Sequence, residues 1–288
     1  MSSFSLRSML PLIVILAACT AKDASKSANA SDSTSATVAA KPHQMTIVAT
    51  EYHFDAPDEV PAGMMTVHLV DNGAELHHVA FIKLNDGKTL ADVEQAMKTQ
   101  GPLPMWAIDH GGVNPSRPGG GMATTTQMLE PGNYALLCFI PSADGVPHFA
   151  KGMVRPLTVT ASTDASAPAP TADIVMTLND YSFSTSKPLT AGKHTIEIKN
   201  SGPQSHELVL ARMAPGKKAA DLGAWVEKMN GPPPAEPIGG VPAIATGTSA
   251  FMTADLTPGD YALICFIPDA KDGKSHFTHG MLQDVHVQ

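Results

Sequence analysis

The sequence of 288 residues has no extended run of basic residues. It carries 19 lysines and arginines against 27 aspartates and glutamates, which gives a formal net charge of −8 at pH 7. Binding to nucleic acid through phosphates needs clustered positive charge, so we expect no nucleic-acid partner. The modest acidity favours solubility and does not identify a partner.

Long hydrophobic runs are also scarce at the N-terminus, where the apolar stretch Met9–Ala18 is too short to span a bilayer as a helix. Arg7 precedes it, and a positive residue before a short apolar run is typical of an export signal. The run ends in Leu16-Ala17-Ala18-Cys19. This ending resembles the lipobox of bacterial lipoproteins, in which the equivalent of Cys19 becomes the lipidated first residue of the mature chain.

The lipobox resemblance implies a signal peptide over residues 1–19 and a membrane contact made only through a lipid on Cys19. It places the protein in the cell envelope, facing the periplasm or the exterior. Residues 20–44 are rich in Ser, Ala, Thr and Lys and have almost nothing to bury, so we expect a flexible tether. A plain secretory signal with a chance cysteine is the alternative.

Cysteine is rare, with three in the chain, namely Cys19, Cys138 and Cys265. If Cys19 carries lipid, two remain, and two cysteines in an exported protein suggest a disulfide by default. An internal duplication argues against that default.

Residues 45–160 align with residues 173–288 along nearly their whole length, which is the signature of a repeated unit. The longest match pairs Pro131–Pro141 with Pro258–Pro268. Residues 161–172 between the repeats are rich in Ser, Ala, Pro and Thr and are expected to be a linker. The sequence therefore predicts two domains, 45–160 and 173–288.

Each repeat has the pattern of a small β-domain. Short β-branched or apolar runs such as 64–71 and 77–84 are separated by the turn signal Asn72-Gly73. Thr89–Gln100 and Lys218–Asn230 have the apolar spacing of helices. The Pro/Gly-rich stretches that follow are expected to be loops: Gly101–Gly121 and Gly231–Gly247. We therefore predict an all-β sandwich or barrel in each repeat, with one short helical insertion.

Cys138 and Cys265 occupy the same position in the two predicted domains. A disulfide between them would require their strands to meet with Cα atoms within about 7 Å. We therefore expect both thiols to be unpaired, and metal ligation is the natural use of an unpaired cysteine in an oxidising compartment.

A histidine and a methionine follow each of these cysteines, and another histidine precedes it at the start of a strand. The sets are His77, Cys138, His148 and Met153 in the first repeat, and His206, Cys265, His276 and Met281 in the second. Two histidines, a cysteine and a weak methionine form the ligand set of blue-copper electron-transfer sites. A lone methionine is usually core filler, but here all four residue types recur at equivalent places.

These motifs carry a family resemblance. Gly132-x-Tyr134-x3-Cys138 followed by His148-x4-Met153 resembles the C-terminal signature of plastocyanin-like cupredoxins, and the second repeat matches it equally. The long ligand loop is similar to that of the type 1 site in copper nitrite reductases. The resemblance implies two tandem cupredoxin-like Greek-key β-sandwich domains, each holding one type 1 copper through the four residues above.

Two positions depart from the family pattern. The residue after the first ligand is His78 or Glu207, where plastocyanin-like proteins usually have an asparagine that holds the ligand loop. In the second repeat, His279 lies between His276 and Met281 and is a competing candidate for the metal.

The ligand set predicts single-electron transfer, because a type 1 copper has no open coordination position for a substrate. One loop histidine, His148 or His276, is then expected near the surface as the electron exit, toward a redox partner that the sequence does not identify. The alternatives are a periplasmic copper carrier or buffer, and a metal-free cupredoxin-like module that binds a partner.

Enzymes with tandem cupredoxin domains, such as nitrite reductases and small laccases, hold additional copper through extra histidines, typically one beside the ligand cysteine. Here the cysteines are flanked by hydrophobic residues: Leu137, Phe139, Ile264 and Phe266. The sequence therefore predicts that the protein is not an enzyme, with a two-domain multicopper enzyme as the minor alternative.

Overall fold

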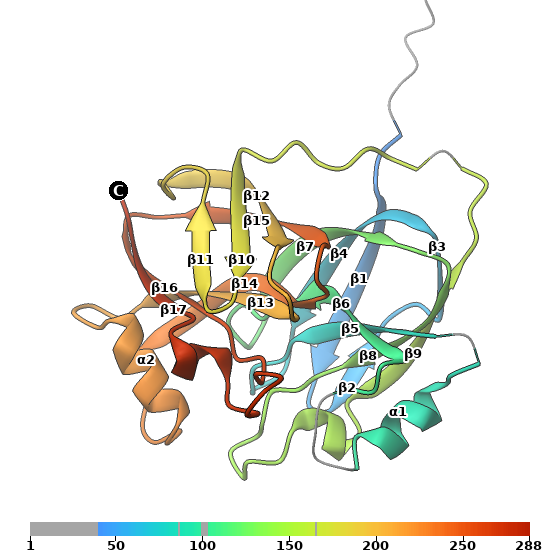
Figure 1. Cartoon of the computed structure of the whole chain (residues 1–288), viewed down its shortest axis with the longest axis horizontal. Helices are drawn as coiled ribbons and strands as arrows, with labels where there is room; N and C mark the ends of the chain where they lie inside the picture. The colour runs from blue at the N-terminus through green and yellow to red at the C-terminus, as the bar shows by residue number, and fades with distance from the viewer. Residues whose placement is uncertain (1–39, 86, 99–102, 165) are drawn as a thin grey trace, which may run out of the picture. The chain divides into compact units, whose positions relative to one another are not determined.

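The computed structural model describes residues 40–288 except 86, 99–102 and 165 (Figure 1). The predicted signal peptide 1–19, the lipidation site Cys19 and the tether up to residue 39 lie outside the described residues and stay predictions. Within the described part of the chain, no helix is both long enough and apolar enough to cross a membrane.

Strands make up about half of each half of the described chain. The first half contains β1 (His43–Thr50), β2 (His53–Asp55), β3 (Glu59–Pro61), β4 (Gly63–Asp71), β5 (Val79–Leu84), β6 (Ala107–Val113), β7 (Gly121–Leu129), β8 (Gly132–Leu137) and β9 (Val154–Thr160). The second half contains β10 (Ile174–Asn179), β11 (Ser182–Thr185), β12 (Gly192–Asn200), β13 (His206–Met213), β14 (Ala235–Ile244), β15 (Ser249–Leu256), β16 (Gly259–Ile264) and β17 (Leu282–Val287). The helices are α1 (Leu90–Ala96) and α2 (Ala219–Val226), and the 3-10 turns are η1 (His148–Lys151) and η2 (His276–His279).

The strands form two sheets that both run from one half into the other. The eight-stranded sheet has the order β11-β10-β12-β15-β7-β4-β1-β2, and the nine-stranded sheet has the order β17-β16-β13-β14-β6-β5-β8-β9-β3. The halves are joined by β15 beside β7, with Phe251 opposite Thr126, and by β14 beside β6, with Ile244 opposite His110. Figure 1 shows the blue and green strands of the first half continuing into the yellow and red strands of the second.

Period-two burial explains why these sheets pack face to face. In β1 the buried residues are Met45, Ile47 and Ala49, and they alternate with residues that are more exposed. Side chains of a strand point alternately to opposite faces, so one face of β1 is buried. Each half thus has its own core, and the cores contain Cys138 and Cys265 respectively. The predicted all-β class, with two sandwiches and one short helix in each, is confirmed.

The boundaries 45–160 and 173–288 remain a prediction, because both sheets continue across them. Each α-helix is shorter than its sequence pattern predicts. Thr89 caps α1: its hydroxyl accepts from the Asp92 N–H, and the Asp92 carboxylate accepts from the Thr89 N–H in return.

The prediction that the Pro/Gly-rich stretches are loops was wrong, because they contain β6 and β14. Gly112 and Gly240 have φ values of +121° and +142°, a region that favours glycine. A Cβ on Gly112 would lie 2.0 Å from the Val79 carbonyl oxygen, and one on Gly240 would lie 1.9 Å from that of Leu208. Both pairs of strands also shift register nearby. At these glycines the strand is irregular and its backbone comes close to that of the neighbouring strand. In the sequence they had indicated only a loop.

Candidate metal centre

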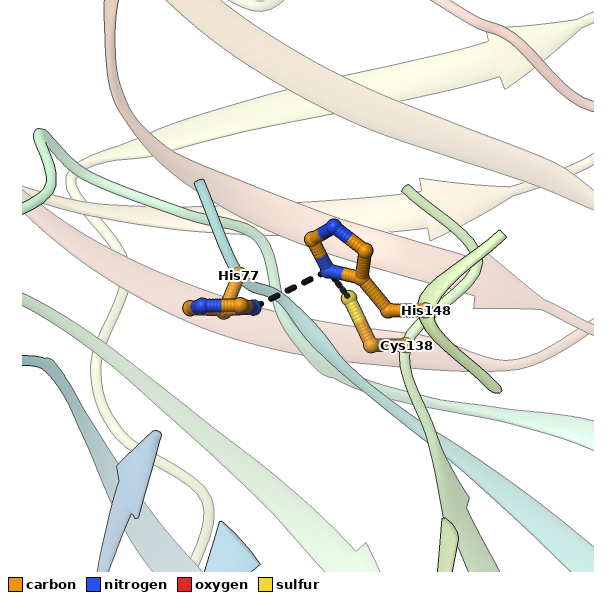
Figure 2. A group of neighbouring side chains, drawn as sticks. All are labelled: His77, Cys138 and His148. Atoms are coloured by element: carbon orange, nitrogen blue, oxygen red, sulfur yellow. Dashed lines mark hydrogen bonds between the residues drawn. The ribbon is translucent and has the colours of Figure 1, made fainter. Parts of the chain in front are cut away.

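In each half, two histidines and one cysteine come together from separate elements. His77 precedes β5, Cys138 directly follows β8, and His148 begins η1. Figure 2 shows their side chains pointing toward one another. His206, Cys265 and His276 form the same group in the second half.

The donor atoms have the same separations in both groups. The Nδ1 atoms of His77 and His148 are 3.0 Å apart, and the Cys138 Sγ lies 3.4 Å from the His148 Nδ1. In the second group the two distances are again 3.0 Å and 3.4 Å. All six side chains are fully buried. The two groups thus share one geometry, which the separate elements hold in both halves.

The two predicted axial methionines are fixed close to these groups by backbone hydrogen bonds. The Cys138 N–H donates to the Met153 carbonyl at 3.3 Å, and the Met153 N–H donates to the His148 carbonyl at 3.0 Å. Met281 is bonded in the same way to Cys265 and His276. Both methionines are fully buried, and their role as axial ligands stays a prediction.

The turn that carries each loop histidine is held against the cysteine. The Phe149 N–H donates to the Cys138 carbonyl at 2.8 Å, and the Phe277 N–H donates to the Cys265 carbonyl at 2.9 Å. Gly152 ends η1 with a φ of +102°, a left-handed conformation that glycine adopts without strain. The sequence motif Gly-Met therefore provides both the turn and the following residue.

Burial sets the protonation of the donors. It lowers the pKa of His77 and of His276 to about 4, and it also lowers the pKa of His206. Neutral imidazoles keep a free lone pair for a metal. Burial raises the pKa of the Cys138 thiol to about 12 and raises that of Cys265 as well. A thiol in such a setting becomes a thiolate when a metal ion replaces its proton.

This donor set fits a transition-metal ion. Typical zinc bond lengths are about 2.0 Å to imidazole nitrogen and about 2.3 Å to thiolate sulfur. One ion can lie at such distances from atoms that are 3.0 and 3.4 Å apart. A soft thiolate together with imidazoles suits copper in both oxidation states.

His78 and Glu207, the two departures from the family pattern, hold the ligand loops. The Phe139 N–H donates to the His78 Nε2 at 2.8 Å, and the Phe266 N–H donates to a Glu207 carboxylate oxygen at 2.8 Å. Burial lowers the pKa of His78 to about 4, so this ring is neutral and its Nε2 accepts. Different residue types thus restrain the residue after each cysteine.

A carboxylate contacts a different histidine in each group. In the first, the His148 Nε2 lies 2.8 Å from the Glu75 Oε2, and in the second, the His206 Nε2 lies 2.8 Å from the Asp180 Oδ1. The Nε2 atoms of the other two histidines, His77 and His276, are buried and have no hydrogen-bond partner among the described residues. Carboxylate contacts of this kind orient metal-binding histidines and raise their basicity.

His148 and His276, one of which was expected near the surface, both have 0% exposure, although His148 contacts the partly exposed Glu75. The Tyr52 ring meets His148 edge-on with centroids 5.3 Å apart, and Tyr181 does the same to His276 at 5.4 Å. These tyrosines help to cover the ring edges that the prediction had placed at the surface.

His279 does not join the second group. Its Nε2 lies 3.1 Å from the Asp272 Oδ1, and its ring packs on Tyr181. The counterpart in the first half is Lys151, which contacts Asp144 at 2.8 Å. Sequence proximity to His276 had suggested competition, but the ring is paired with the neighbouring carboxylate instead. Cys138 and Cys265 are both free thiols, which confirms that they form no disulfide.

No protein-family model and no curated protein matches the chain. Solved structures do match it. A dithionite-reduced auracyanin from Roseiflexus castenholzii is 26% identical, with a TM-score of 0.30, over 42% of this chain and 99% of its own. A multicopper oxidase is 14% identical, with a TM-score of 0.25, over 85% of this chain and 88% of its own. A copper-containing nitrite reductase from Thermus scotoductus is 11% identical, with a TM-score of 0.24, over 86% of this chain and 62% of its own.

In each half of this chain the four residues follow one another in the order His, Cys, His, Met. Each half is a cupredoxin-like β-sandwich. The sandwich explains why the donors converge, because His77 lies just before β5 while Cys138 and His148 bracket the loop after the neighbouring strand β8.

The prediction that the chain is not an enzyme is corrected by the same matches. The proteins that match across both halves include a multicopper oxidase and a nitrite reductase, which are enzymes by name. The prediction rested on Leu137, Phe139, Ile264 and Phe266 beside the cysteines. These four residues describe only the positions next to each thiol, and they do not exclude catalysis elsewhere in a two-sandwich chain.

Proposed function

We propose that this protein transfers single electrons through a type 1 copper ion in each half. The observation that carries the proposal is the pair of buried His-Cys-His groups, whose Nδ1 and Sγ atoms converge with equal spacing in both halves. When bound, copper in such a ligand set supplies a one-electron couple.

The residues of the chain provide a rigid and dry pocket for that couple. Cys138 is restrained on both sides, by its own N–H to Met153 and by the Phe149 N–H to its carbonyl. The His77 and His148 rings are buried and held by the sandwich, so little ligand movement accompanies a change of charge. A preorganised ligand set lowers the reorganisation that each electron transfer requires.

Full burial of the donors favours electron transfer over copper carriage. A carrier has to release its ion to a partner, whereas an electron crosses a few ångströms of protein without exposing the ligands. His77, Cys138, His148 and Met153 all have no exposed surface.

The deciding experiment is to add Cu(II) to the purified protein and record its visible spectrum. An intense band at about 600 nm is expected from a thiolate-bound blue copper. Cys138→Ser and Cys265→Ser should each remove about half of the band, and the double variant should remove all of it. His68→Gln is the matched control and should leave the band unchanged, because His68 bonds Thr124 away from both groups.

Three results would contradict the proposal. Binding of Cu(I) without any coloured Cu(II) form would support a carrier, and binding of neither ion would remove copper altogether. A band that both single cysteine variants leave intact would show that the colour arises elsewhere.

We also propose that Cys19 is lipidated and anchors the protein in the cell envelope, on the basis of Leu16-Ala17-Ala18-Cys19. Cells fed a labelled fatty acid should incorporate the label into the protein but not into Cys19→Ser. Equal labelling of both forms would contradict the anchor.

A further inference from the structure

A buried chain of hydrogen bonds runs between the two ligand loops. Its centre is Asn114, which directly follows β6 and is fully buried. The Asn114 N–H donates to the Gly240 carbonyl at 3.1 Å, and its side-chain amide donates to the Leu208 carbonyl at 2.8 Å. A residue of the first half is therefore held by backbone atoms of the second.

The side chain of Asn114 meets both residues that hold the ligand loops. Its Oδ1 lies 3.1 Å from the His78 Nδ1, and its Nδ2 donates to a Glu207 carboxylate oxygen at 3.4 Å. His78 and Glu207 are 8% and 4% exposed, so this contact is shielded from water.

Donors and acceptors agree along the whole chain of bonds. The His78 Nε2 accepts from the Phe139 N–H, so in a neutral ring the Nδ1 carries the proton and donates to Asn114. The Asn114 Nδ2 donates to one carboxylate oxygen of Glu207. The other Glu207 oxygen accepts from the Phe266 N–H. The carbonyl of an asparagine needs a donor and its NH₂ needs an acceptor, and His78 and Glu207 supply one of each.

Both ends of the chain of bonds reach the centres covalently. Phe139 follows Cys138, and Phe266 follows Cys265. A route of covalent and hydrogen bonds thus joins the two cysteines without crossing solvent. Electronic coupling falls off less along such a route than across a gap between unbonded atoms.

Only one half supplies the central residue. Gly111-Gly112-Val113-Asn114 corresponds to Gly239-Gly240-Val241-Pro242 in the other repeat. Proline has neither a backbone N–H nor a side-chain amide, so one asparagine serves both halves.

We propose that Asn114 couples the two centres, so that an electron entering one centre passes to the other within the same chain through His78, Asn114 and Glu207. The inference rests on the proposed function. One centre is oxidised by one electron and the other is reduced by that same electron, so no further oxidant, reductant or proton is needed. Asn114 is a positioning residue, since it touches neither ligand cysteine.

The test reduces fully oxidised, copper-loaded protein by less than one electron per molecule with a radiolysis pulse and follows the redistribution between the centres. The unsubstituted protein should show a first-order phase whose rate does not depend on protein concentration. Asn114→Leu, which removes all three side-chain bonds, to His78, Glu207 and the Leu208 carbonyl, should slow this phase at least tenfold without changing the visible band. Asn114→Asp keeps the acceptor for His78 but loses the donor to Glu207, and it should also slow the phase.

Gln127→Leu is the matched control. Gln127 is a buried amide that bonds the backbone of β6 at Gly112 and His110 and contacts neither ligand loop. The Gln127→Leu variant should be less stable than the unsubstituted protein, but the rate of the first-order phase should stay the same. An unchanged rate in both Asn114 variants, or a rate that rises with protein concentration, would overturn the bridge while leaving the blue-copper assignment intact.

A second measurement uses the protein without copper. It distinguishes a missing hydrogen-bond chain through Asn114 from a failure to bind copper. Substituting Asn114 should shift the backbone amide resonances of Phe139 and Phe266 together, whereas Gln127→Leu should shift neither. A shift at one phenylalanine alone would show that the bonds do not form one chain.

Discussion

Glu75 and Asp180 give the two centres different electrostatic surroundings although their donor atoms are arranged alike. Glu75 contacts the loop histidine His148, and Asp180 contacts the strand histidine His206. The Asp269 Oδ2 also lies 3.8 Å from the Nε2 of the loop histidine His276, so the second group has a carboxylate beside each histidine. We expect the two centres to have different reduction potentials.

Glu75→Gln should raise the reduction potential of the first centre by on the order of 60 mV, which is a tenfold change for a one-electron couple. A carboxylate stabilises the oxidised centre more than the reduced one, because the oxidised centre carries more positive charge. Spectroelectrochemistry in a Cys265→Ser background isolates the first centre. Glu59→Gln, an exposed change in β3, is the control, and an unchanged or lowered potential in Glu75→Gln would contradict the argument.

His110 makes the stability of the metal-free protein depend on pH. Burial lowers its pKa, and its Nε2 lies 2.9 Å from the Met128 carbonyl oxygen. The unfolded chain takes up a proton near the ordinary histidine pKa while the folded protein does not, so folding loses stability as the pH falls through that range. Urea unfolding of His110→Gln should therefore show a smaller loss between pH 8 and pH 5, and an equal loss would contradict this.

Single residues also show how far sequence reasoning reaches. All four residue types of the ligand set recur in both repeats, so the candidate ligands could be predicted, and the structure brings each His-Cys-His trio together. His78 and Glu207 were visible only as departures from a pattern. Asn114 could not be found, because its counterpart is Pro242 and its contacts exist only once the halves are packed.

Among the elements, β6 and β14 contain glycines that their strand pairing requires. The same glycines led to the prediction of loops at these positions. The spacing of apolar residues predicted the helices and most strands, since their periodicity reflects one buried face. In a sequence, a Gly-Gly pair usually indicates a turn or loop. Here the pair lets each strand come close to its neighbour, a role that only the partner strand reveals.

Gly240→Ala should destabilise the protein by at least about 2 kcal/mol, because it adds left-handed strain and a clash with the Leu208 carbonyl. Gly216→Ala is the matched control: its φ is also positive, at +76°, but nothing lies within 4 Å of the added carbon. That change should cost only about 1–2 kcal/mol of strain. Chemical denaturation measures both, and equal losses would show that the close approach has no energetic weight.

At the scale of the molecule, the described residues belong to one compact unit, in which both sheets pass between the halves. The Ser/Ala/Pro/Thr-rich composition of residues 161–172 predicted a linker, but composition does not predict whether strands pair between the two repeats. The pairing of β15 with β7, and the bonds of Asn114, depend on tertiary packing.

The metal-free protein should therefore unfold in one cooperative transition. Differential scanning calorimetry should give a calorimetric enthalpy equal to the van't Hoff enthalpy, as expected for a single unit. Two resolved transitions, each matching one repeat, would show that the contacts between the halves are too weak to couple them.

The continuous sheets also have a consequence for synthesis. The edges of β6 and β7 are covered by β14 and β15, which are made only after the linker. At about 5–20 residues per second, the ribosome needs on the order of ten seconds to produce them. During that interval a folded first half presents two open edges, and open edges add strands from neighbouring chains. Crowded nascent copies of this protein are therefore most exposed to mispairing before their second half is complete.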